Sequence, residues 1–197
     1  SATTLTEING TATFIAGPAA QVHVISATES APGTADSIVI TIRVEDADGN
    51  IQASHPAYTA TIGVDGAAGI VGSPISLPDG TGSTTVTVTD AVAEVVNVTL
   101  TETSATALTE VNGTATFIAG PATTVRVVSA TEPAPGTANS LVVTIRVEDA
   151  SGNVQPSHAA YAATVGVNGS SSVIGSPISI PNGTGTTTVT VNNAKAE

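Results

Sequence analysis

Residues Ser37–Val44 read SIVITIRV, with Ile or Val at every second position and Ser, Val, Thr or Arg between them. This alternation with a period of two is typical of a β-strand with one buried face. The same pattern recurs at 58–64 (YTATIGV) and at 83–89 (STTVTVT). No stretch has a convincing helical period, so the sequence predicts an all-β fold without helices.

Clusters of turn-forming residues separate these alternating stretches. They read APGTAD at 31–36, DADGN at 46–50 and LPDGTG at 77–82. Gly, Pro, Asp and Asn at such positions favour tight turns between strands. About seven short strands in roughly 100 residues predict an immunoglobulin-like β-sandwich. The strands are expected near 21–27, 37–44, 58–64, 71–76, 83–88, 94–101 and 114–118.

The chain is internally duplicated. Residues 1–94 align with residues 104–197 without a gap, and 66 of the 94 aligned positions are identical. A repeat of this length corresponds to a whole small domain rather than to a single strand or helix pair. The sequence therefore predicts tandem β-sandwiches of the same design.

Charge and composition exclude several kinds of partner. The chain has 16 acidic residues against four Lys and Arg, which gives a formal net charge of −12. Such a chain cannot neutralise the phosphates of nucleic acid. No apolar run approaches the roughly 20 residues that span a bilayer, so we expect no membrane insertion. The absence of cysteine removes disulfides and thiolate chemistry.

Three motifs resemble the bacterial immunoglobulin-like repeats of invasin- and intimin-type adhesins. They are FIAGPA at 14–19 and 117–122, VTIRVEDASGN at 143–153 and GTGTTTVTV at 183–191. The resemblance covers nearly the whole chain. It implies rod segments that stack end to end on the bacterial cell surface, outside the cell and without catalytic activity. One departure is the pair Ile51-Gln52, repeated as Val154-Gln155, where the family often has Pro-Val.

In that family the motif FxAGP joins the last strand of one domain to the start of the next. The resemblance therefore implies three segments: residues 1–17 as the last strand or hairpin of a neighbouring domain, 18–120 as a complete sandwich, and 121–197 as a second sandwich that is incomplete by itself. The implied joint residues are Phe14, Gly17, Pro18, Phe117, Gly120 and Pro121.

An incomplete sandwich exposes unpaired strand edges and part of its core. Further copies of the same repeat are therefore the expected partners. Two routes remain open at this point. The chain is one section of a longer covalent array, or separate subunits assemble head to tail, with the first residues of one completing its neighbour by strand addition.

The turn after Ser37–Val44 and its copy in the second half of the chain carry the candidate metal ligands. Asp46, Asp48 and Asn50 alternate as hard oxygen ligands do in a calcium loop, but Ser151 replaces Asp48 in the second copy. A tight turn is the simpler interpretation. If calcium binds, we expect it where two domains meet, with Asp46, Asp48, Glu148 and Asp149 as ligands. No other cofactor is expected.

No constellation in the sequence predicts an enzyme. His55 and His158 occur in the same SHxAY context, but no nucleophile elbow or pair of catalytic carboxylates accompanies them. We therefore expect these histidines to bind the backbone of surface loops. The preferred function is a structural spacer or filament segment. The alternative is an adhesin or binding module that contacts a ligand with its polar loops, although loops poor in Tyr and Trp argue against it.

Overall fold

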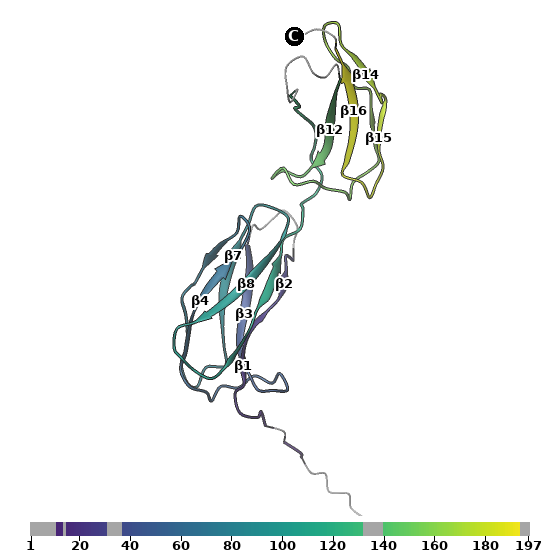
Figure 1. The fold of residues 1–197 in the computed structure, drawn as a ribbon. Helices are drawn as coiled ribbons and strands as arrows, with labels where there is room; N and C mark the ends of the chain where they lie inside the picture. Colours follow the sequence, from purple (N-terminus) through teal and green to yellow (C-terminus); the bar gives the residue numbers. More distant parts are fainter. Residues whose placement is uncertain (1–10, 14, 31–36, 132–139, 194–197) are drawn as a thin grey trace, which may run out of the picture.

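The structure is a computed structural model, and it describes residues 11–13, 15–30, 37–131 and 140–193. The described residues form no helix, and about half of them lie in β-strands. The strands make two units stacked end to end in an elongated molecule (Figure 1). We call the part with strands β1 to β10 the first unit and the part with β11 to β16 the second unit. The prediction of an all-β fold is confirmed.

The first unit is a sandwich of two five-stranded sheets. Their strand orders are β5-β7-β3-β1-β9 and β2-β10-β8-β4-β6. The strands are β1 (Gln21–Ile25), β2 (Ala27–Thr28), β3 (Ser37–Glu45), β4 (Tyr58–Val64), β5 (Gly69–Val71), β6 (Ile75–Leu77), β7 (Ser83–Thr89), β8 (Val95–Glu102), β9 (Thr109–Val111) and β10 (Gly113–Thr116).

Alternation in the sequence becomes alternation in burial. In β3, Ile38, Ile40 and Ile42 are buried between the sheets, whereas Val39 faces solvent. Burying side chains of this size contributes about 1.5–3 kcal/mol each. The buried cluster of the first unit is built from Val, Ile, Leu and Ala, with Tyr58 and Phe117 as its aromatic members. Aromatic residues make up only 2% of the sequence, so aliphatic side chains supply most of this core.

The first and last strands of the first unit run side by side through both sheets. Strand β1 pairs with β9 in parallel, and β2 pairs with β10 in parallel. The chain changes sheet between β1 and β2 and again between β9 and β10. Strand β10 also pairs antiparallel with β8, so the last segment of the unit closes both sheets along one side.

The second unit repeats part of this plan. Strands β11 (Thr124–Val128), β12 (Ser140–Glu148), β16 (Thr186–Asn192) and β14 (Ser172–Ile174) form one sheet in that order, and β13 (Tyr161–Ala163) pairs with β15 (Ile178–Ile180). Within the described residues, the second unit has no counterpart of β8, β9 or β10. Its buried cluster is correspondingly smaller, with Ile145, Val147, Ile178, Ile180 and Val189 at its centre.

Seven predicted strands of the first unit become ten because three of them are interrupted. The strand expected at 21–27 changes sheet at Ser26. The strand expected at 71–76 is divided into β5 and β6 by a turn in which Gly72 has φ of 99° and the Ser73–Pro74 bond is cis. The last strand begins earlier than expected, with β9, and changes sheet at Asn112. The described part of the chain has no helix long and apolar enough to cross a membrane.

Candidate functional site: the joint between the units

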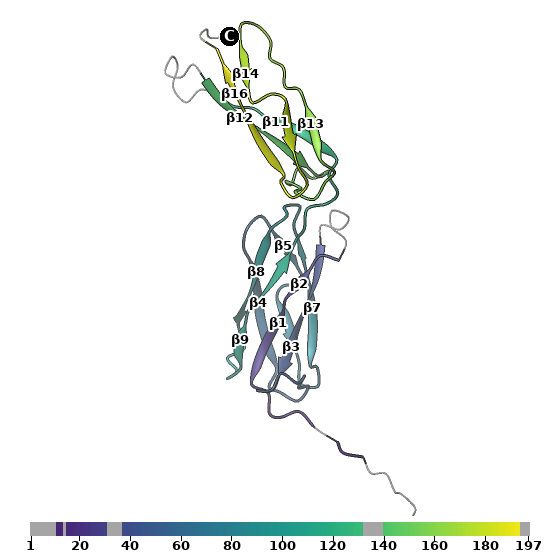
Figure 2. The same ribbon diagram turned by 90° about the vertical axis from the view of Figure 1, so that its right-hand side faces the viewer.

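The chain passes from the first unit to the second through the segment between β10 and β11 (Figure 2). This segment contains Phe117, Gly120 and Pro121, three of the residues expected at a joint. Phe117 is 5% exposed and lies in the core of the first unit. The aromatic side chain therefore anchors the first-unit end of the joint, and Gly120 and Pro121 lie between it and β11.

Asp149 fixes the backbone at Gly120. It follows β12, and its Oδ2 accepts a hydrogen bond of 2.8 Å from the Gly120 N–H. Its Oδ1 accepts bonds from the N–H groups of Ser151 (2.9 Å) and Asn153 (2.8 Å). One carboxylate thus shapes its own turn and ties that turn to the joint. The Gln155 side chain donates to the carbonyls of Ala119 and Gly120 from the same side.

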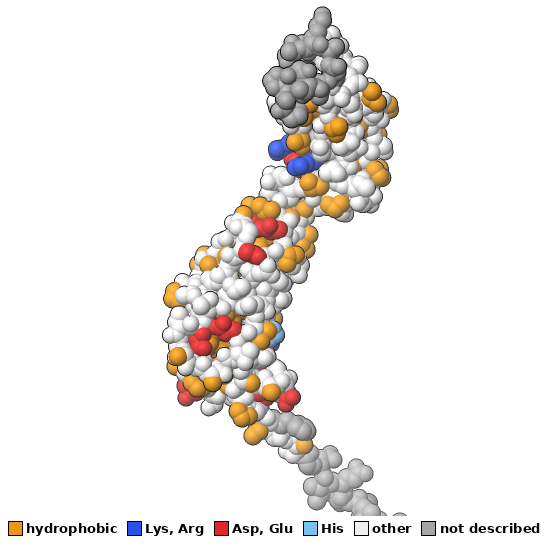
Figure 3. Space-filling view, viewed as in Figure 1, with side chains coloured by type: hydrophobic (Ala, Val, Ile, Leu, Met, Phe, Trp, Pro, Cys, Tyr) orange, Lys and Arg blue, Asp and Glu red, His pale blue; other side chains and the backbone are white. Residues whose placement is uncertain are grey.

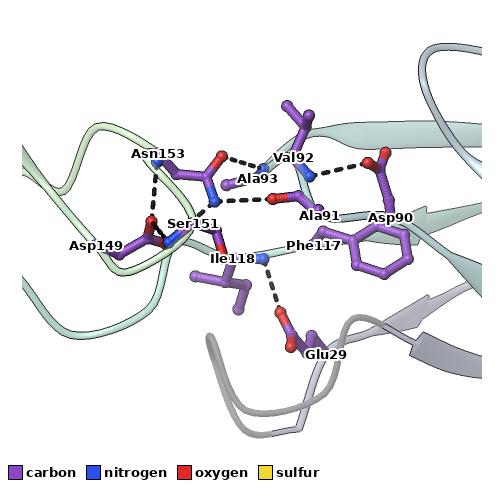
Figure 4. A pocket seen from close by; sticks show the side chains of 10 residues that line it. All are labelled: Glu29, Asp90, Ala91, Val92, Ala93, Phe117, Ile118, Asp149, Ser151 and Asn153. Atoms are coloured by element: carbon purple, nitrogen blue, oxygen red, sulfur yellow. Dashed lines mark hydrogen bonds between the residues drawn. The ribbon is translucent and has the colours of Figure 1, made fainter.

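Asn153 connects the two units directly. Its side-chain oxygen accepts a hydrogen bond of 2.9 Å from the Ala93 N–H, and its Nδ2 donates to the Ala91 carbonyl at 3.0 Å. Figure 4 shows this side chain reaching from the turn of the second unit to the backbone between β7 and β8 of the first. Nδ2 also donates to Asp149 Oδ2 at 3.1 Å. We call the two bonds to Ala91 and Ala93 the inter-unit staple.

Two further buried carboxylates stiffen the first-unit side of the joint. Glu29 Oε2 accepts a bond of 3.1 Å from the Ile118 N–H, and Asp90 Oδ1 accepts one of 2.8 Å from the Val92 N–H. Glu29 and Asp90 are 8% and 6% exposed. The cavity among these groups and Asp149 measures about 10 Å³. This is the lower limit for a single water molecule, so the joint leaves no room for an organic ligand.

The same arrangement occurs at the far end of the first unit, around Gly17. Asp46 Oδ2 accepts a bond of 2.7 Å from the Gly17 N–H, and its Oδ1 accepts bonds from Asp48 N–H (3.0 Å) and Asn50 N–H (2.9 Å). The Gln52 side chain donates to the Gly17 carbonyl at 2.5 Å. We call this arrangement, an aspartate and a glutamine that bind the backbone of a glycine, the backbone clamp. It occurs in both copies of the repeat, 103 residues apart.

Both clamp carboxylates are held in the charged form. The side chain of Asn50, its N–H and the Gly17 N–H lower the pKa of Asp46 from 3.8 to about 2. Burial raises the pKa of Asp149, but the hydrogen bonds from Asn153, Gly120 and Ser151 together outweigh burial and lower it. Donors that favour the ionised carboxylate also make it a stronger hydrogen-bond acceptor at neutral pH.

The proposed calcium ligands divide between two turns. Asp46 and Asp48 lie at the free end of the first unit, and Asp48 contributes its N–H to the turn while its side chain is exposed. Asp149 lies at the joint, beside Asp90 and Glu29. Glu148 instead faces Arg126, with Nε and Oε2 2.8 Å apart. Within the described ranges, no three acidic or histidine side chains gather as metal ligands do. Where calcium would bind, if it binds, stays a conditional prediction.

Two expected joint residues of the first copy, Gly17 and Pro18, do not follow a strand within the described residues, as Gly120 and Pro121 do. Phe14 lies outside the described residues. Gly17 and Pro18 precede β1, next to the Asp46 turn, and residues 11–13 and 15–17 belong to no strand of this chain. The expected domain boundaries at 17/18 and 120/121 coincide with the two clamps, and they remain a prediction.

Gln52, Asn153 and Gln155 were not predicted as site residues from the sequence, and Asn50 was considered only as a possible calcium ligand. Both glutamines stand where the resembled family often has Val, so the departure from the family pattern was the available signal. Each turn asparagine follows a glycine with positive φ, Gly49 or Gly152. A glycine-asparagine turn is common, and nothing local distinguishes an asparagine that reaches a second unit.

The histidines act as backbone ligands. His55 places Nδ1 2.7 Å from the Pro56 carbonyl and Nε2 2.7 Å from the Thr81 carbonyl. His158 makes the equivalent contacts with Ala159 and Thr184. His55 is buried, at 6% exposed, rather than on the surface as expected. With both ring nitrogens engaged, neither is free to transfer a proton to a substrate.

Comparison with solved structures finds immunoglobulin-like surface proteins of bacteria. The adhesin FdeC of Escherichia coli is 20% identical, with 91% of this chain and 57% of that chain covered and a TM-score of 0.47. The D0-D1 domain of intimin is 18% identical, with 90% and 86% covered and a TM-score of 0.36. Domains 5-6 of the S-layer protein SbsC are 18% identical, with 93% and 86% covered and a TM-score of 0.31. No family model and no curated protein matches the sequence.

Proposed function

We propose that the chain is a structural spacer, a rod segment built from tandem immunoglobulin-like sandwiches whose joint fixes the direction of one unit relative to the next. The observation that carries this proposal is the inter-unit staple of Asn153 together with the Asp149 clamp on Gly120. Hydrogen bonds on both sides of a short connection restrict its torsions, and a restricted joint transmits orientation along a rod.

The rest of the molecule supports the same role. The joint has room for at most one water molecule. In the face seen in Figure 3, hydrophobic side chains lie in small scattered groups rather than in one broad patch. A spacer needs stable neighbours and an inert surface, and it needs no pocket.

The sequence motifs, which resemble repeats of bacterial surface adhesins, support a location for the rod. We propose an extracellular position on the bacterial surface, as part of an adhesin or of a surface layer. The excess of acidic residues, 16 against four basic ones, keeps such a rod soluble and discourages nonspecific association between neighbouring rods.

Small-angle X-ray scattering tests the rigidity of the joint. The wild-type chain should fit one extended conformation. A matched variant with a short Gly-Ser insertion between Gly120 and Pro121 should require a broad ensemble, because flexible linkers of this composition behave as random coils. If the wild-type chain needs an ensemble as broad as that of the insertion variant, the joint is a hinge and the proposed function is wrong.

A further inference from the structure

An open groove lies on the outer face of the first unit. It has a volume of about 430 Å³. It crosses β4 and β8, which pair with each other on the face seen in Figure 1, and it reaches the point where the chain changes sheet between β9 and β10. Apart from Val64, the residues that line it are polar or glycine, so the groove offers hydrogen bonds rather than an apolar surface. They are Gly63, Asp65, Asn97, Thr99 and Asn112.

Gly63 leaves the middle of the groove open. It lies directly opposite Thr99 in the pairing of β4 with β8, and a Cβ added to it would lie 2.8 Å from Thr99 Oγ1. A larger residue would therefore occupy the space beside this hydroxyl, whereas glycine lets a ligand approach the backbone. Thr99 Oγ1 donates to the Gly63 carbonyl at 3.3 Å. This bond uses the hydroxyl proton, and the oxygen can still accept a bond from a ligand.

Asp65 and Asn97 fix each other at one end of the groove. Asp65 Oδ2 accepts a bond of 2.6 Å from Asn97 Nδ2, and its Oδ1 accepts one of 2.7 Å from the Asn97 N–H. The side-chain bond and then the backbone bond lower the pKa of Asp65, so it is charged at neutral pH. A carboxylate accepts only from a donor, so the nitrogen of the Asn97 amide must face it. The amide oxygen of Asn97 is left as a further acceptor at the groove.

Asn112 supplies the opposite chemistry at the other end. Strand β10 pairs with β8 only from Val95 to Val98. Beyond that point the Leu100 N–H donates to Asn112 Oδ1 at 3.0 Å instead. Because an N–H donor must face the amide oxygen, the orientation of the Asn112 amide is fixed, and Nδ2 carries two protons that it can donate. Within the described part of the chain, no hydrogen bond engages this nitrogen. The groove therefore has acceptors at one end and a donor at the other.

The size, charge and polarity of the groove restrict what it can bind. It spans the neighbouring strands β10, β8 and β4, and two strand spacings amount to about 10 Å, so it fits a small molecule or one unit of a polymer. No Lys or Arg is among the lining residues to balance a phosphate, sulfate or uronate, and the charge of Asp65 repels such anions. Val64 alone cannot bury the apolar side chains that anchor a peptide. A neutral ligand rich in hydroxyl groups fits all three restrictions.

We propose that this groove binds a neutral sugar unit of a glycan. Each sugar hydroxyl both donates and accepts hydrogen bonds, so hydroxyls can donate to the oxygens of Asp65 and Asn97 while another accepts from Asn112 Nδ2. A few fixed polar groups of this kind give a small-molecule site its specificity. No aromatic side chain is among the lining residues, so we expect a weak site with a Kd of about 1 mM. This binding is additional to the spacer role and does not depend on the joint.

Titration of the ¹⁵N-labelled chain with sugars, followed by NMR, tests the proposal. The probes are the methyl glycosides of glucose, galactose, mannose and N-acetylglucosamine. At least one should shift the amide signals of the lining residues and reach saturation. Asn112→Asp keeps the acceptor for the Leu100 N–H but removes the Nδ2 donor, so it should weaken binding at least tenfold. Thr85→Ala is the matched control, because Thr85 is exposed on β7 of the other sheet, and it should bind as the wild type does.

Asp65→Asn is the second variant. It places in the first unit the residue that the second copy has at Asn168, so the fold should tolerate it, and the loss of the charged acceptor should also weaken binding at least tenfold. The proposal is overturned if none of the four sugars shifts the signals of the groove. It is equally overturned if the shifts spread over both units without saturation, or if both variants bind as tightly as the wild type. A flexible joint would leave this titration unchanged, so failure of the spacer proposal is separate from failure of sugar binding.

Discussion

Replacing Asn153 with alanine measures how strongly the joint couples the two units. The change removes the bond from the Ala93 N–H and the bond to the Ala91 carbonyl. A hydrogen bond of this kind contributes about 0.5–1.5 kcal/mol net. Losing two therefore costs about 1–3 kcal/mol, which lowers the ratio of stapled to unstapled molecules roughly 5- to 150-fold.

Asn50→Ala is the matched control. Asn50 and Asn153 each donate from Nδ2 to the aspartate of their own turn, at 3.0 Å and 3.1 Å. Only Asn153 also reaches the other unit. Both variants lose the bond inside the turn, so the difference between them isolates the inter-unit staple.

The assay is pulsed electron paramagnetic resonance between two spin labels. The chain has no cysteine, so V71C and I174C can be labelled without background. Val71 and Ile174 are 65% and 61% exposed and occupy equivalent positions in the two units. We expect a narrow distance distribution for the wild type and Asn50→Ala and a broad one for Asn153→Ala. Equal widths for the two alanine variants would refute the staple.

Four further outcomes are expected. The folded-state pKa of Asp46 is about 2, below its ordinary 3.8, so its contribution to stability is complete above pH 3.8 and is lost as the pH falls towards 2. The difference in melting temperature between the wild type and Asp46→Asn should therefore shrink over that interval. A constant difference would contradict the role of Asp46 at Gly17. Gly113→Ala should destabilise the first unit by about 1–3 kcal/mol in urea unfolding, because the new Cβ meets the Val24 carbonyl; unchanged stability would show that the strand moves freely. In the variant Tyr161→Phe, Tyr58 is the remaining tyrosine, and it should stay protonated at alkaline pH for as long as the protein is folded. Burial first, and then the hydrogen bond and charge of a glutamate, raise the pKa of Tyr58. Tyrosinate absorbance in the folded protein would contradict the burial of Tyr58. The melting temperature should be the same with calcium as with chelator, because N–H donors already occupy the oxygens of Asp46 and Asp149. A higher melting temperature with calcium would establish a site, since a ligand that binds only the folded form must stabilise it.

The fold was largely predictable because its strongest signals are local. Alternation at 37–44 and 58–64, with glycine and aspartate turns between, determines both the strands and their buried faces. The division of the strand at 71–76 was missed, although Gly72, Ser73 and Pro74 form a turn signal between two short apolar runs. The changes of sheet at Ser26 and Asn112 depend on pairing between the first and last strands of the unit. The local sequence pattern does not predict such long-range pairing.

The sequence predicted where the joint lies but not which side chains hold it. The repeated FIAGPA motif located it, and Asp46 and Asp149 were identified as residues of interest. Their role was assigned to turns or to calcium, whereas each carboxylate also binds the joint backbone of its unit. That contact spans 29 residues of sequence. The reach of Asn153 to Ala91 spans 62, and only the stacked arrangement of the units makes it visible.

Residual dipolar couplings measured on the labelled, dilute chain test the central claim most directly, that the joint makes one rigid rod of two units. Backbone N–H couplings from β1–β10 and from β11–β16 each define an alignment tensor for their own unit. A rigid joint requires the two tensors to agree in magnitude and orientation, and we predict that agreement. Tensors of clearly different magnitude would show that the units reorient independently, and the account of the clamp and the staple would be wrong.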